Sequence, residues 1–388
     1  MTAYGRALPR GDLVLTHVGA GTPCGEFLRR YWHPIALARS VGPRPQRVRL
    51  LGEDLVLFRD GHGRAGLLYP RCMHRGTSLY YGRVEEGGIR CCYHGWLFDV
   101  QGNCLEQPCE PDGGRHRDQA RQPWYPVQER YGLVFAYMGP PEKIPQLPRY
   151  SVLEDLEPGE RIATEDGCRF GPHGDSGMPV IPFTWMHNQD NFMDPYHVYV
   201  LHSTFTVPQF AAGFAIMPEV EFEYLPAGIM YKARRMLEGG RSMTRVSCLL
   251  MPNVASVPDV ELADSRSMSI AWNVPIDDTH HQSFRAIRTR ETDEALFKPL
   301  EYAGKTWNEM TPDERRDTPG DFEAQWGQGP VTLSSEEHLV SSDRGIIMLR
   351  RLMLKQVEIV AAGGDPVGVT FGADSPLVTV PSGNFYDP

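Results

Sequence analysis

The sequence lacks three features that would place it in common classes of protein. It has no apolar run near about 18 residues, so we expect no membrane-spanning helix. Its first residues lack a basic region followed by an apolar core, so we expect no secretory signal. Lys and Arg number 39 against 49 Asp and Glu, a formal charge of −10, whereas a nucleic-acid binder usually shows a basic face.

The eight cysteines show no obvious disulfide framework. Disulfides persist in oxidising compartments, so free cysteines together with metal-ligand spacing are typical of a reducing cytoplasm, which is where we expect the protein. Hydrophobic residues make up 41% and charged residues 23%, as in an ordinary globular protein. A length of 388 residues favours two domains.

Two Cys-His pairs form the strongest motif in the sequence. Cys72-Met-His74 is followed after sixteen residues by Cys91-Cys-Tyr-His94. Two thiolates on one iron and two imidazoles on the other are the ligands of a Rieske-type [2Fe–2S] cluster. The main alternative is a structural Cys2His2 zinc site, although its two histidines are usually close in sequence. Coincidence among 8 Cys and 13 His is the other alternative.

The pattern of elements changes along the chain and predicts two units. Short strands with turn signals begin at residue 46 and continue to residue 138, which predicts a small all-β domain with an N-terminal arm. A proline-rich run near residues 140–148 reads as a linker, so we expect domains at residues 1–145 and 146–388. The second unit combines alternating segments, typical of an antiparallel sheet, with helical ones, so the fold class is α+β. Helices are expected near residues 21–31, 178–205, 294–316, 321–328 and 341–362.

A second metal site is predicted between residues 190 and 202. His197 and His202 are five residues apart, so on an ideal α-helix their rings would point about 140° apart. A break or wide turn between them would bring both onto one metal. Two imidazoles and one carboxylate make the facial triad of non-haem Fe(II) oxygenases. Asp194, three residues before His197, is suited to accept the ring N–H of a ligand histidine. The alternative is two unrelated histidines near a helix.

The motifs together resemble the Rieske non-haem iron ring-hydroxylating oxygenases, in their alpha (terminal oxygenase) component. The flanks His74-Arg75-Gly76 and Tyr93-His94-Gly95-Trp96 agree with that family. Segments such as LRRYWHPIAL, CYHGWLFDVQGNC and EHLVSSDRGIIMLRRLML resemble its phthalate dioxygenase-like branch, and the resemblance covers nearly the whole chain. It implies a helix-grip-type catalytic domain after the Rieske domain, with a mononuclear Fe(II).

The resemblance also implies roles for particular residues. Asp321 looks like the third iron ligand, although Gly320 stands where the family usually has Gln, and Asp343 is the reserve candidate. Asn191 resembles an asparagine near the iron. Asp194 would bridge His197 to His94 of the next chain in a homotrimer or a dimer of trimers.

The implied reaction is dioxygen activation with electrons from a separate reductase that carries a flavin and a ferredoxin-type centre. We expect hydroxylation or dihydroxylation of an aromatic acid resembling phthalate. One alternative is oxidative O-demethylation of a methoxylated aromatic acid. Others are a non-catalytic Rieske electron carrier and a zinc-stabilised binding module. An acidic substrate needs a cation, because Arg binds carboxylate in a bidentate manner. The candidates on or near the expected sheet are Arg234, Arg235, Arg245, Arg285 and Arg288.

Overall fold

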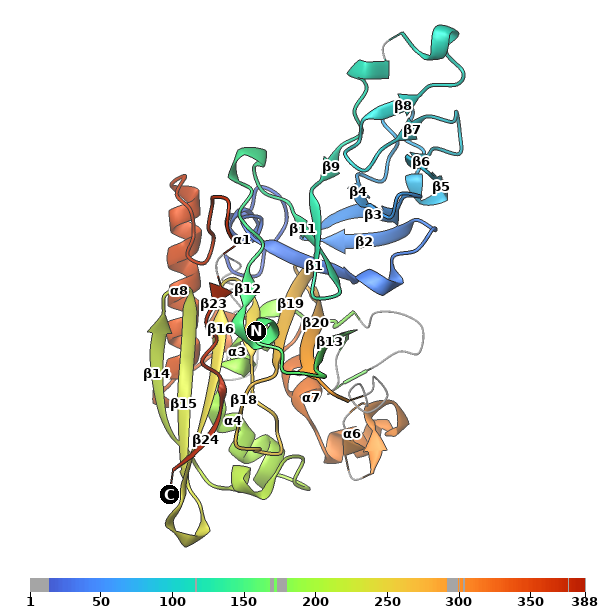
Figure 1. Ribbon diagram of the computed structural model, residues 1–388. Coiled ribbons are helices and arrows are strands. Elements are labelled where there is room, and N and C mark those ends of the chain that lie inside the picture. Colours follow the sequence, from blue (N-terminus) through green and yellow to red (C-terminus); the bar gives the residue numbers. More distant parts are fainter. Residues whose placement is uncertain are drawn as a thin grey trace, which may run out of the picture.

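The computed structural model describes residues 14–115, 117–167, 171–172, 180–291, 299, 301–302, 304–375 and 377–387. The chain forms an N-terminal part of small antiparallel sheets and a C-terminal part built on one large antiparallel sheet (Figure 1). The α+β fold class expected from the sequence is confirmed. None of the helices in the described ranges is both long and apolar enough to cross a membrane.

The N-terminal part contains three sheets, with strand orders β1-β11-β10, β2-β3-β4-β9 and β5-β6-β7-β8. Helix α1 (Pro23–Leu28) precedes them, and Thr22 caps it by accepting a hydrogen bond from the amide of Gly25 at 3.1 Å. The strands are β1 (Trp32–Leu37), β2 (Gln46–Leu50), β3 (Glu53–Arg59), β4 (Ala65–Leu68), β5 (Arg83–Glu85), β6 (Gly88–Arg90), β7 (Leu97–Phe98), β8 (Cys104–Glu106), β9 (Trp124–Tyr125), β10 (Val127–Arg130) and β11 (Leu133–Tyr137).

The large sheet has the order β13-β20-β19-β17-β16-β15-β14; β24 also pairs with β16, and β18 pairs with β24. Its strands are β13 (Arg161–Asp166), β14 (Glu219–Leu225), β15 (Gly228–Met236), β16 (Ser242–Leu250), β17 (Val254–Ser256), β18 (Ser265–Arg266), β19 (Ser269–Asp277), β20 (His280–Thr289) and β24 (Gly383–Asp387). Two short pairs lie outside it: β12 (Arg149–Tyr150) with β23 (Leu377–Val378), and β21 (Glu301–Tyr302) with β22 (Lys305–Thr306).

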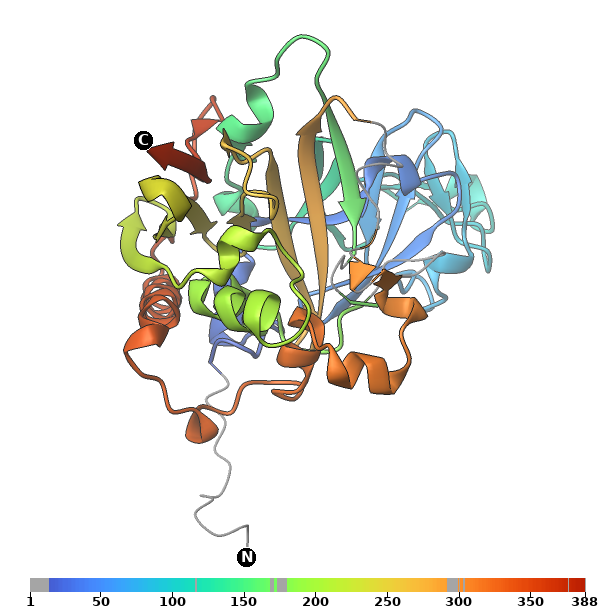
Figure 2. The same cartoon turned by 90° about the horizontal axis from the view of Figure 1, so that it is seen from below.

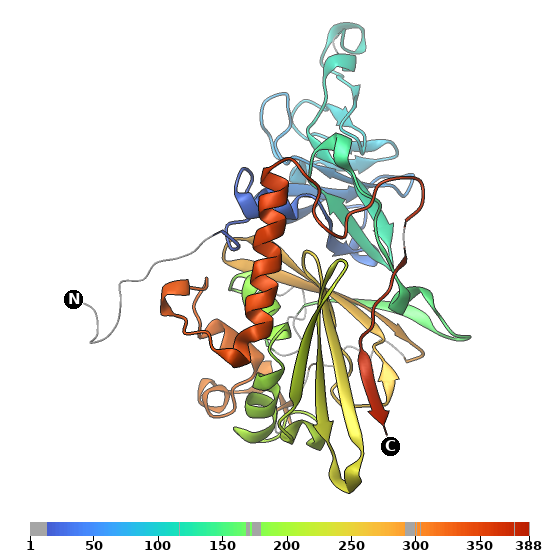
Figure 3. The same ribbon diagram turned by 90° about the vertical axis from the view of Figure 1, so that its left-hand side faces the viewer.

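The helices of the C-terminal part position the candidate iron site. They are α2 (Ser151–Glu154), α3 (Trp185–Phe192), α4 (Pro195–Tyr199), α6 (Pro312–Asp317), α7 (Asp321–Trp326) and α8 (Arg344–Ala361). Seen from below, α3 and α4 lie against the sheet, while α8 is viewed along its axis (Figure 2). Helix α8 runs along the side of the molecule and packs on α1, α3 and β15 (Figure 3).

Each predicted helical segment contains a helix, but the expected helix over 178–205 is divided into α3, α4 and the turn Val200–Thr204, and residues 180–184 are not helical. The segment near residues 294–316 contains the hairpin β21–β22 and only the short helix α6, while residues 292–298, 300 and 303 lie outside the described part of the chain. The same holds for residues 178–179, at the start of the expected helix over 178–205. Strands β1, β13, β16 and β24 show no clear alternation of polar and apolar residues in the sequence. For β1 and β16 the reason is burial, since β1 is buried along its whole length and β16 along most of it.

One hydrophobic core joins the two parts of the molecule. It contains buried residues from Leu15 to Val380. Within it the rings of Phe135 and Tyr150 pack edge-on against Trp272 on β19, with centroid distances of 5.6 and 5.9 Å. Edge-to-face aromatic pairs add to the stabilisation from burial. The cluster-binding loops pack in a second, smaller core, which contains Cys72 and Cys91 and is joined to the large one through β3.

A half-buried ion cluster links α8 to α3. Arg350 binds Asp190 through two nitrogens, at 3.2 and 2.6 Å, and Glu337 through two, at 2.7 and 2.8 Å. Burial raises the pKa of Asp190 to about 6, although the charge of Arg350 acts in the opposite direction. Because Asp190 precedes Asn191 directly, this ion cluster holds the part of α3 that faces the candidate iron site.

We expect Arg350→Ala to lower the free energy of unfolding by about 3 kcal/mol, because it leaves Asp190 buried and unpaired. The measurement is the urea midpoint of the purified protein. Arg351→Ala is the matched control: Arg351 is exposed on the same helix, so its replacement should change stability by less than about 0.5 kcal/mol. Equal losses in the two variants would show that the ion cluster has no special role.

Candidate metal centres

Two loops with the same closure carry the four predicted cluster ligands. In the first loop the amide of Gly76 donates to the carbonyl of Cys72 at 2.8 Å, and the amide of Cys72 donates to Thr77 at 2.9 Å. The second loop repeats both bonds around Cys91, at 3.1 and 2.8 Å, with Gly95 in the position of Gly76. Both glycines have positive φ, 77° and 73°, a conformation that other residues adopt at a cost.

The loops place thiols inside and imidazoles outside. Cys72 and Cys91 are 2% and 3% exposed and lie close enough for the Cys91 thiol to raise the pKa of Cys72, after burial as the main cause, to about 12. The rings of His74 and His94 lie nearer the surface, with centroids 4.5 Å apart. Two buried sulfurs below two converging imidazoles fit a [2Fe–2S] cluster with mixed ligation. Cys92 is exposed.

A buried glutamine that the sequence argument missed holds the first loop. Gln122 is fully buried; its amide nitrogen donates to the carbonyls of Tyr69 and Arg71 at 2.8 and 2.9 Å, and its oxygen accepts from the amide of Met73 at 2.8 Å. All three partners surround Cys72. No sequence pattern pointed to this residue, because it lies about fifty positions downstream.

A charged side chain holds the second loop. Arg90 donates to the carbonyl of Gly95 at 2.6 Å and pairs with Glu85 and Glu106 at 2.8 and 2.7 Å. The hydrogen bond that Glu85 accepts from Arg90 is the main reason why the pKa of Glu85 is lowered to about 2. Both loops are therefore fixed by donors that bind main-chain carbonyls.

The two histidines of the second predicted site lie on a helix that widens between them. Helix α4 carries His197 and continues into a π-helical turn, Val200–Thr204, which carries His202. There the amide of Phe205 donates to the carbonyl of Val200, five residues earlier, at 2.8 Å. In this wider turn residues five apart lie nearly above one another, unlike in an α-helix. The wide turn expected from the spacing is present.

Asp321, at the start of α7, completes the group. Its Oδ1 lies 3.1 Å from Nε2 of His202 and 3.5 Å from Nε2 of His197. In the described part of the chain these three residues are the one group whose ligand atoms all lie within 4.8 Å of one another. Two donor atoms that each bind one ion at about 2.1 Å, at right angles, are about 3.0 Å apart, so the site fits a metal with a facial triad.

Hydrogen bonds around this site set which ring nitrogen faces the metal. Nδ1 of His202 binds Oε1 of Gln209 at 2.6 Å, and Nδ1 of His197 binds the main-chain carbonyl of Asp194. Since those oxygens accept hydrogen bonds, Nδ1 carries the proton and Nε2 is free to ligate. Gln209 also donates to the carbonyl of Pro319, two residues before Asp321, at 3.1 Å, and it was missed in the sequence.

The sequence predicts that the Asp194 carboxylate accepts the ring N–H of a ligand histidine. In the structure the main-chain carbonyl of Asp194 occupies that position instead. Its Oδ1 caps α4 by accepting from the amides of Tyr196 and His197 at 3.0 and 3.3 Å. Its Oδ2 is 3.7 Å from Nδ1 of His197, beyond hydrogen-bond distance, because the carbonyl of the same residue already occupies that nitrogen. The reserve ligand Asp343 accepts a hydrogen bond from the amide of Val340 and is not part of the group.

The electrostatics of the group suit a cation. Burial acts to raise the pKa of Asp321, but His202 and His197 outweigh it and hold that pKa well below its usual range. Asn191 adds to this, since its amide donates to Oδ1 of Asp321 at 3.0 Å. Burial acts to lower the pKa of His202, and Asp321 outweighs it, so that the pKa is raised. The Asp321 carboxylate stabilises positive charge placed between it and the two rings, and it would stabilise a metal ion there in the same way.

A cavity of about 560 Å³ opens onto these residues. That volume is in the usual range for small-molecule sites. Its walls include the aromatic rings of Phe183, Phe210 and Phe214, and the candidate cations Arg245 and Arg285. Arg234, Arg235 and Arg288 are not among its lining residues.

The two candidate arginines in the cavity are already engaged. Arg245 donates to the carbonyls of Asp259 and Pro258, both at 2.7 Å, and Arg285 pairs with Glu165 at 2.5 Å. Arg266, which the sequence argument did not single out, also lines the cavity and is exposed.

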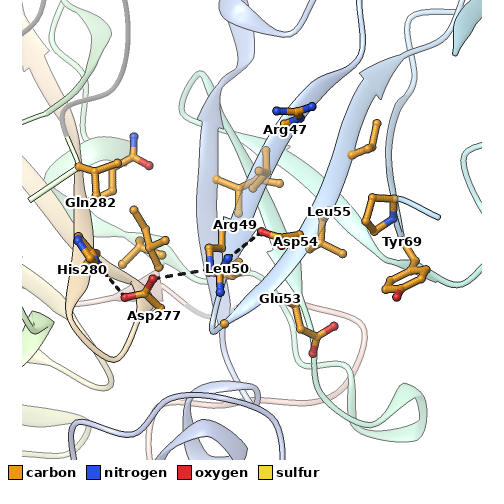
Figure 4. Close-up of a pocket in the computed structure, with 18 of the residues that line it drawn as sticks. Arg47, Arg49, Leu50, Glu53, Asp54, Leu55, Tyr69, Asp277, His280 and Gln282 are labelled. Carbon is orange, nitrogen blue, oxygen red and sulfur yellow. Dashed lines mark hydrogen bonds and ion pairs between the residues drawn. The ribbon is translucent and has the colours of Figure 1, made fainter. Parts of the chain in front are cut away.

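A larger cleft, of about 1110 Å³, lies between the β2–β3 hairpin and strands β19 and β20 (Figure 4). Asp277 is paired there with His280 at 2.9 Å and with Arg49 at 3.7 Å. The cleft shares only Phe284 with the cavity at His197, and none of the metal-ligating groups found among the described residues faces it.

Comparisons with known proteins agree with this geometry. The family model of the Rieske [2Fe-2S] domain matches residues 31–126. The "Phenoxybenzoate dioxygenase subunit alpha" of Ectopseudomonas oleovorans is 56% identical over 388 residues, which cover 99% of this chain and 94% of that protein. The "Tert-butanol monooxygenase / tert-amyl alcohol desaturase oxygenase subunit" of Aquincola tertiaricarbonis is 35% identical, over 93% of this chain and 79% of that protein.

Among solved structures, Pseudomonas putida CBB5 NdmA with caffeine has a TM-score of 0.64 at 20% identity, over 90% of this chain and 98% of that one, which supports the fold. Two metal centres of these kinds on this fold define a Rieske-type oxygenase. The chain belongs to the Rieske non-haem iron oxygenases, as an alpha (terminal oxygenase) component. It is an oxidoreductase that incorporates oxygen, and its cofactors are a [2Fe–2S] cluster and a mononuclear iron.

Gln209→Leu should weaken binding of the mononuclear iron by about 10–100-fold, because it removes the acceptor that fixes the His202 ring. Iron affinity is measured by chelator competition. The EPR signal of the reduced cluster, which lies elsewhere, should not change. Gln209→Glu keeps an acceptor at the same place and is the matched control. Unchanged iron affinity in the leucine variant would contradict a role for Gln209 in orienting His202.

Proposed function

We propose that this protein is the terminal oxygenase that hydroxylates or dihydroxylates an aromatic acid, of the kind in which two rings are joined by an ether. The observation that carries the proposal is the 56% identity to a phenoxybenzoate dioxygenase alpha subunit along almost the whole of both chains. The aromatic walls of the cavity at His197 suit such a substrate. The relative named for an alcohol is less similar, at 35%.

We further infer that Cys72, His74, Cys91 and His94 hold the cluster. His197, His202 and Asp321 would hold the mononuclear iron. When bound, the cluster supplies single electrons and the ferrous ion activates dioxygen for insertion into the ring. The protein's own residues do the rest.

The neighbouring residues orient the three candidate iron ligands. Gln209 and the carbonyl of Asp194 keep both imidazoles in the ligating tautomer. Asn191 donates to Oδ1 of Asp321 and so restrains the carboxylate of the third candidate ligand. The phenyl walls exclude water from the reacting ring, which limits the loss of activated oxygen to side reactions.

The assembly is part of the proposal. In Figure 1 the cluster-bearing sheet β5–β8 lies at one end of the molecule and α4 at the other. A head-to-tail homotrimer, or a dimer of trimers, would bring His94 of one chain to the free Oδ2 side of Asp194 in the next. We propose the same division at residues 1–145 and 146–388, a separate flavin- and ferredoxin-type reductase, and a cytoplasmic location.

The direct test is a single turnover of the dithionite-reduced protein with isotopically labelled dioxygen. The substrates are 3-phenoxybenzoate, phthalate, a methoxybenzoate and tert-butanol. We expect label in a hydroxylated or dihydroxylated product of an aromatic acid, detected by mass spectrometry. Product from tert-butanol alone would refute the substrate class, and demethylation alone would favour the O-demethylase.

Mixing two inactive variants tests electron transfer between chains. Cys72→Ala lacks the cluster and His197→Ala lacks the mononuclear iron. Randomly mixed trimers should recover about a quarter of wild-type activity, because one head-to-tail contact in four then joins an intact cluster to an intact iron site. Verified mixed trimers without activity would indicate transfer within a chain.

A further inference from the structure

A neutral polar cluster lies in the wall of the iron cavity. Asn188 on α3, Asn273 on β19 and Ser283 on β20 all line the cavity, and His281 lies behind them, fully buried. Asn273 and Ser283 are directly paired across the two strands. Burial lowers the pKa of His281 to about 4, so this cluster carries no charge at neutral pH.

One backbone carbonyl sets the direction of every hydrogen bond in the cluster. The carbonyl of Phe183 lies 2.8 Å from Nδ1 of His281, and because a carbonyl only accepts, Nδ1 carries the proton. Nε2 of His281 is then an acceptor, so the group 3.1 Å away must be the amide nitrogen of Asn188. The same nitrogen donates to Oδ1 of Asn273 at 3.1 Å.

The orientation of Asn273 follows from these bonds. Its Oδ1 accepts from Asn188 and also from the hydroxyl of Ser283, at 2.7 Å. Its Nδ2 is left without a hydrogen-bond partner among the described residues, although the side chain is only 1% exposed. A buried donor without an acceptor is unfavourable, so this position selects a ligand that brings an acceptor.

The donor is close to the reacting centre. Asn188 precedes Asn191 by three residues on α3, a rise of about 4.5 Å. Asn191 contacts Asp321 at 3.0 Å, and Asn188 contacts Asn273 at 3.1 Å. Asn273, His197 and Asp321 line the same cavity, so a small aromatic molecule that contacts Asn273 occupies the cavity of the candidate iron ligands.

We propose that Asn273 is a specificity-determining residue whose amide nitrogen donates a hydrogen bond to an oxygen atom of the aromatic substrate. The inference rests on the proposed function for its substrate class. The oxygen is that of the carboxylate or of the ether, since both accept hydrogen bonds. Asn188, Ser283 and His281 are positioning residues that aim the donor.

The test compares dissociation constants of the metal-loaded protein, measured by calorimetry, for four related molecules. They are 3-phenoxybenzoate, 3-benzylbenzoate without the ether oxygen, diphenyl ether without the carboxylate, and diphenylmethane without either. Asn273→Leu removes the donor. Asn273→Asp keeps the acceptor for Asn188 and Ser283 but replaces the donor. Asn308→Asp, an exposed position outside the cavity, controls for the added charge.

Asn273→Leu should weaken binding at least about tenfold for those molecules that carry the contacted oxygen, and leave diphenylmethane unchanged. A loss with 3-benzylbenzoate identifies the carboxylate, and a loss with diphenyl ether identifies the ether. Asn273→Asp should also leave diphenylmethane unchanged and should weaken binding of the two acids further, because its carboxylate repels theirs.

Equal losses for diphenylmethane, or no loss for any oxygen-bearing molecule, would overturn the inference. Failure of the proposed function has a different signature. If the wild-type protein oxidises no aromatic acid while Asn273→Leu still weakens diphenyl ether selectively, the substrate class is wrong and the role of Asn273 stands.

Discussion

The wide helical turn at Val200–Thr204 is the constraint on which the rest of the iron site depends. Two histidines five residues apart cannot face one ion from a regular α-helix. The π-type hydrogen bond from Phe205 to Val200 changes the helical repeat, and the hydroxyls of Ser203 and Thr204 bind carbonyls five residues earlier, at 3.0 and 2.9 Å. π-turns are rare and occur often at functional sites, which is consistent with a local cost retained for metal binding.

Main-chain carbonyls and buried amide side chains then decide how each functional group points. The carbonyl of Asp194 fixes one imidazole, Gln209 fixes the other, and the carbonyl of Phe183 orients a row of side chains that ends at Asn273. At the cluster, Gln122 does the same for the first loop. A carbonyl can only accept a hydrogen bond. It therefore fixes which atom is the donor in neighbouring amides, imidazoles and hydroxyls, which could otherwise take either role.

Two hydrophobic cores that meet at β3 relate the two metal centres within one chain: Leu55 and Leu57 pack in the large core with Trp272, and Val56 and Phe58 pack in a smaller core with Cys72 and Cys91. Because β3 packs in both cores, the cluster loops stay at the end of the molecule away from α4 (Figure 1). Interiors packed at this density do not deform easily. The cluster histidines, His74 exposed and His94 half-buried, therefore face another molecule rather than the iron site of their own chain, which is why the proposed assembly is head-to-tail.

The sequence by itself determined the α+β class, the two kinds of metal centre and the ligand candidates. Those ligands lie a few residues apart, as in Cys72 and His74 or His197 and His202, so their spacing carries the chemistry. Tertiary structure decided what depends on distant contacts. Strand β16 is buried on both faces and shows no alternation. Asp321 meets His202 across 119 positions, and Gln122, Gln209 and Asn273 belong to no motif. Their roles come from buried hydrogen bonds, whose partners are fixed only when the chain packs.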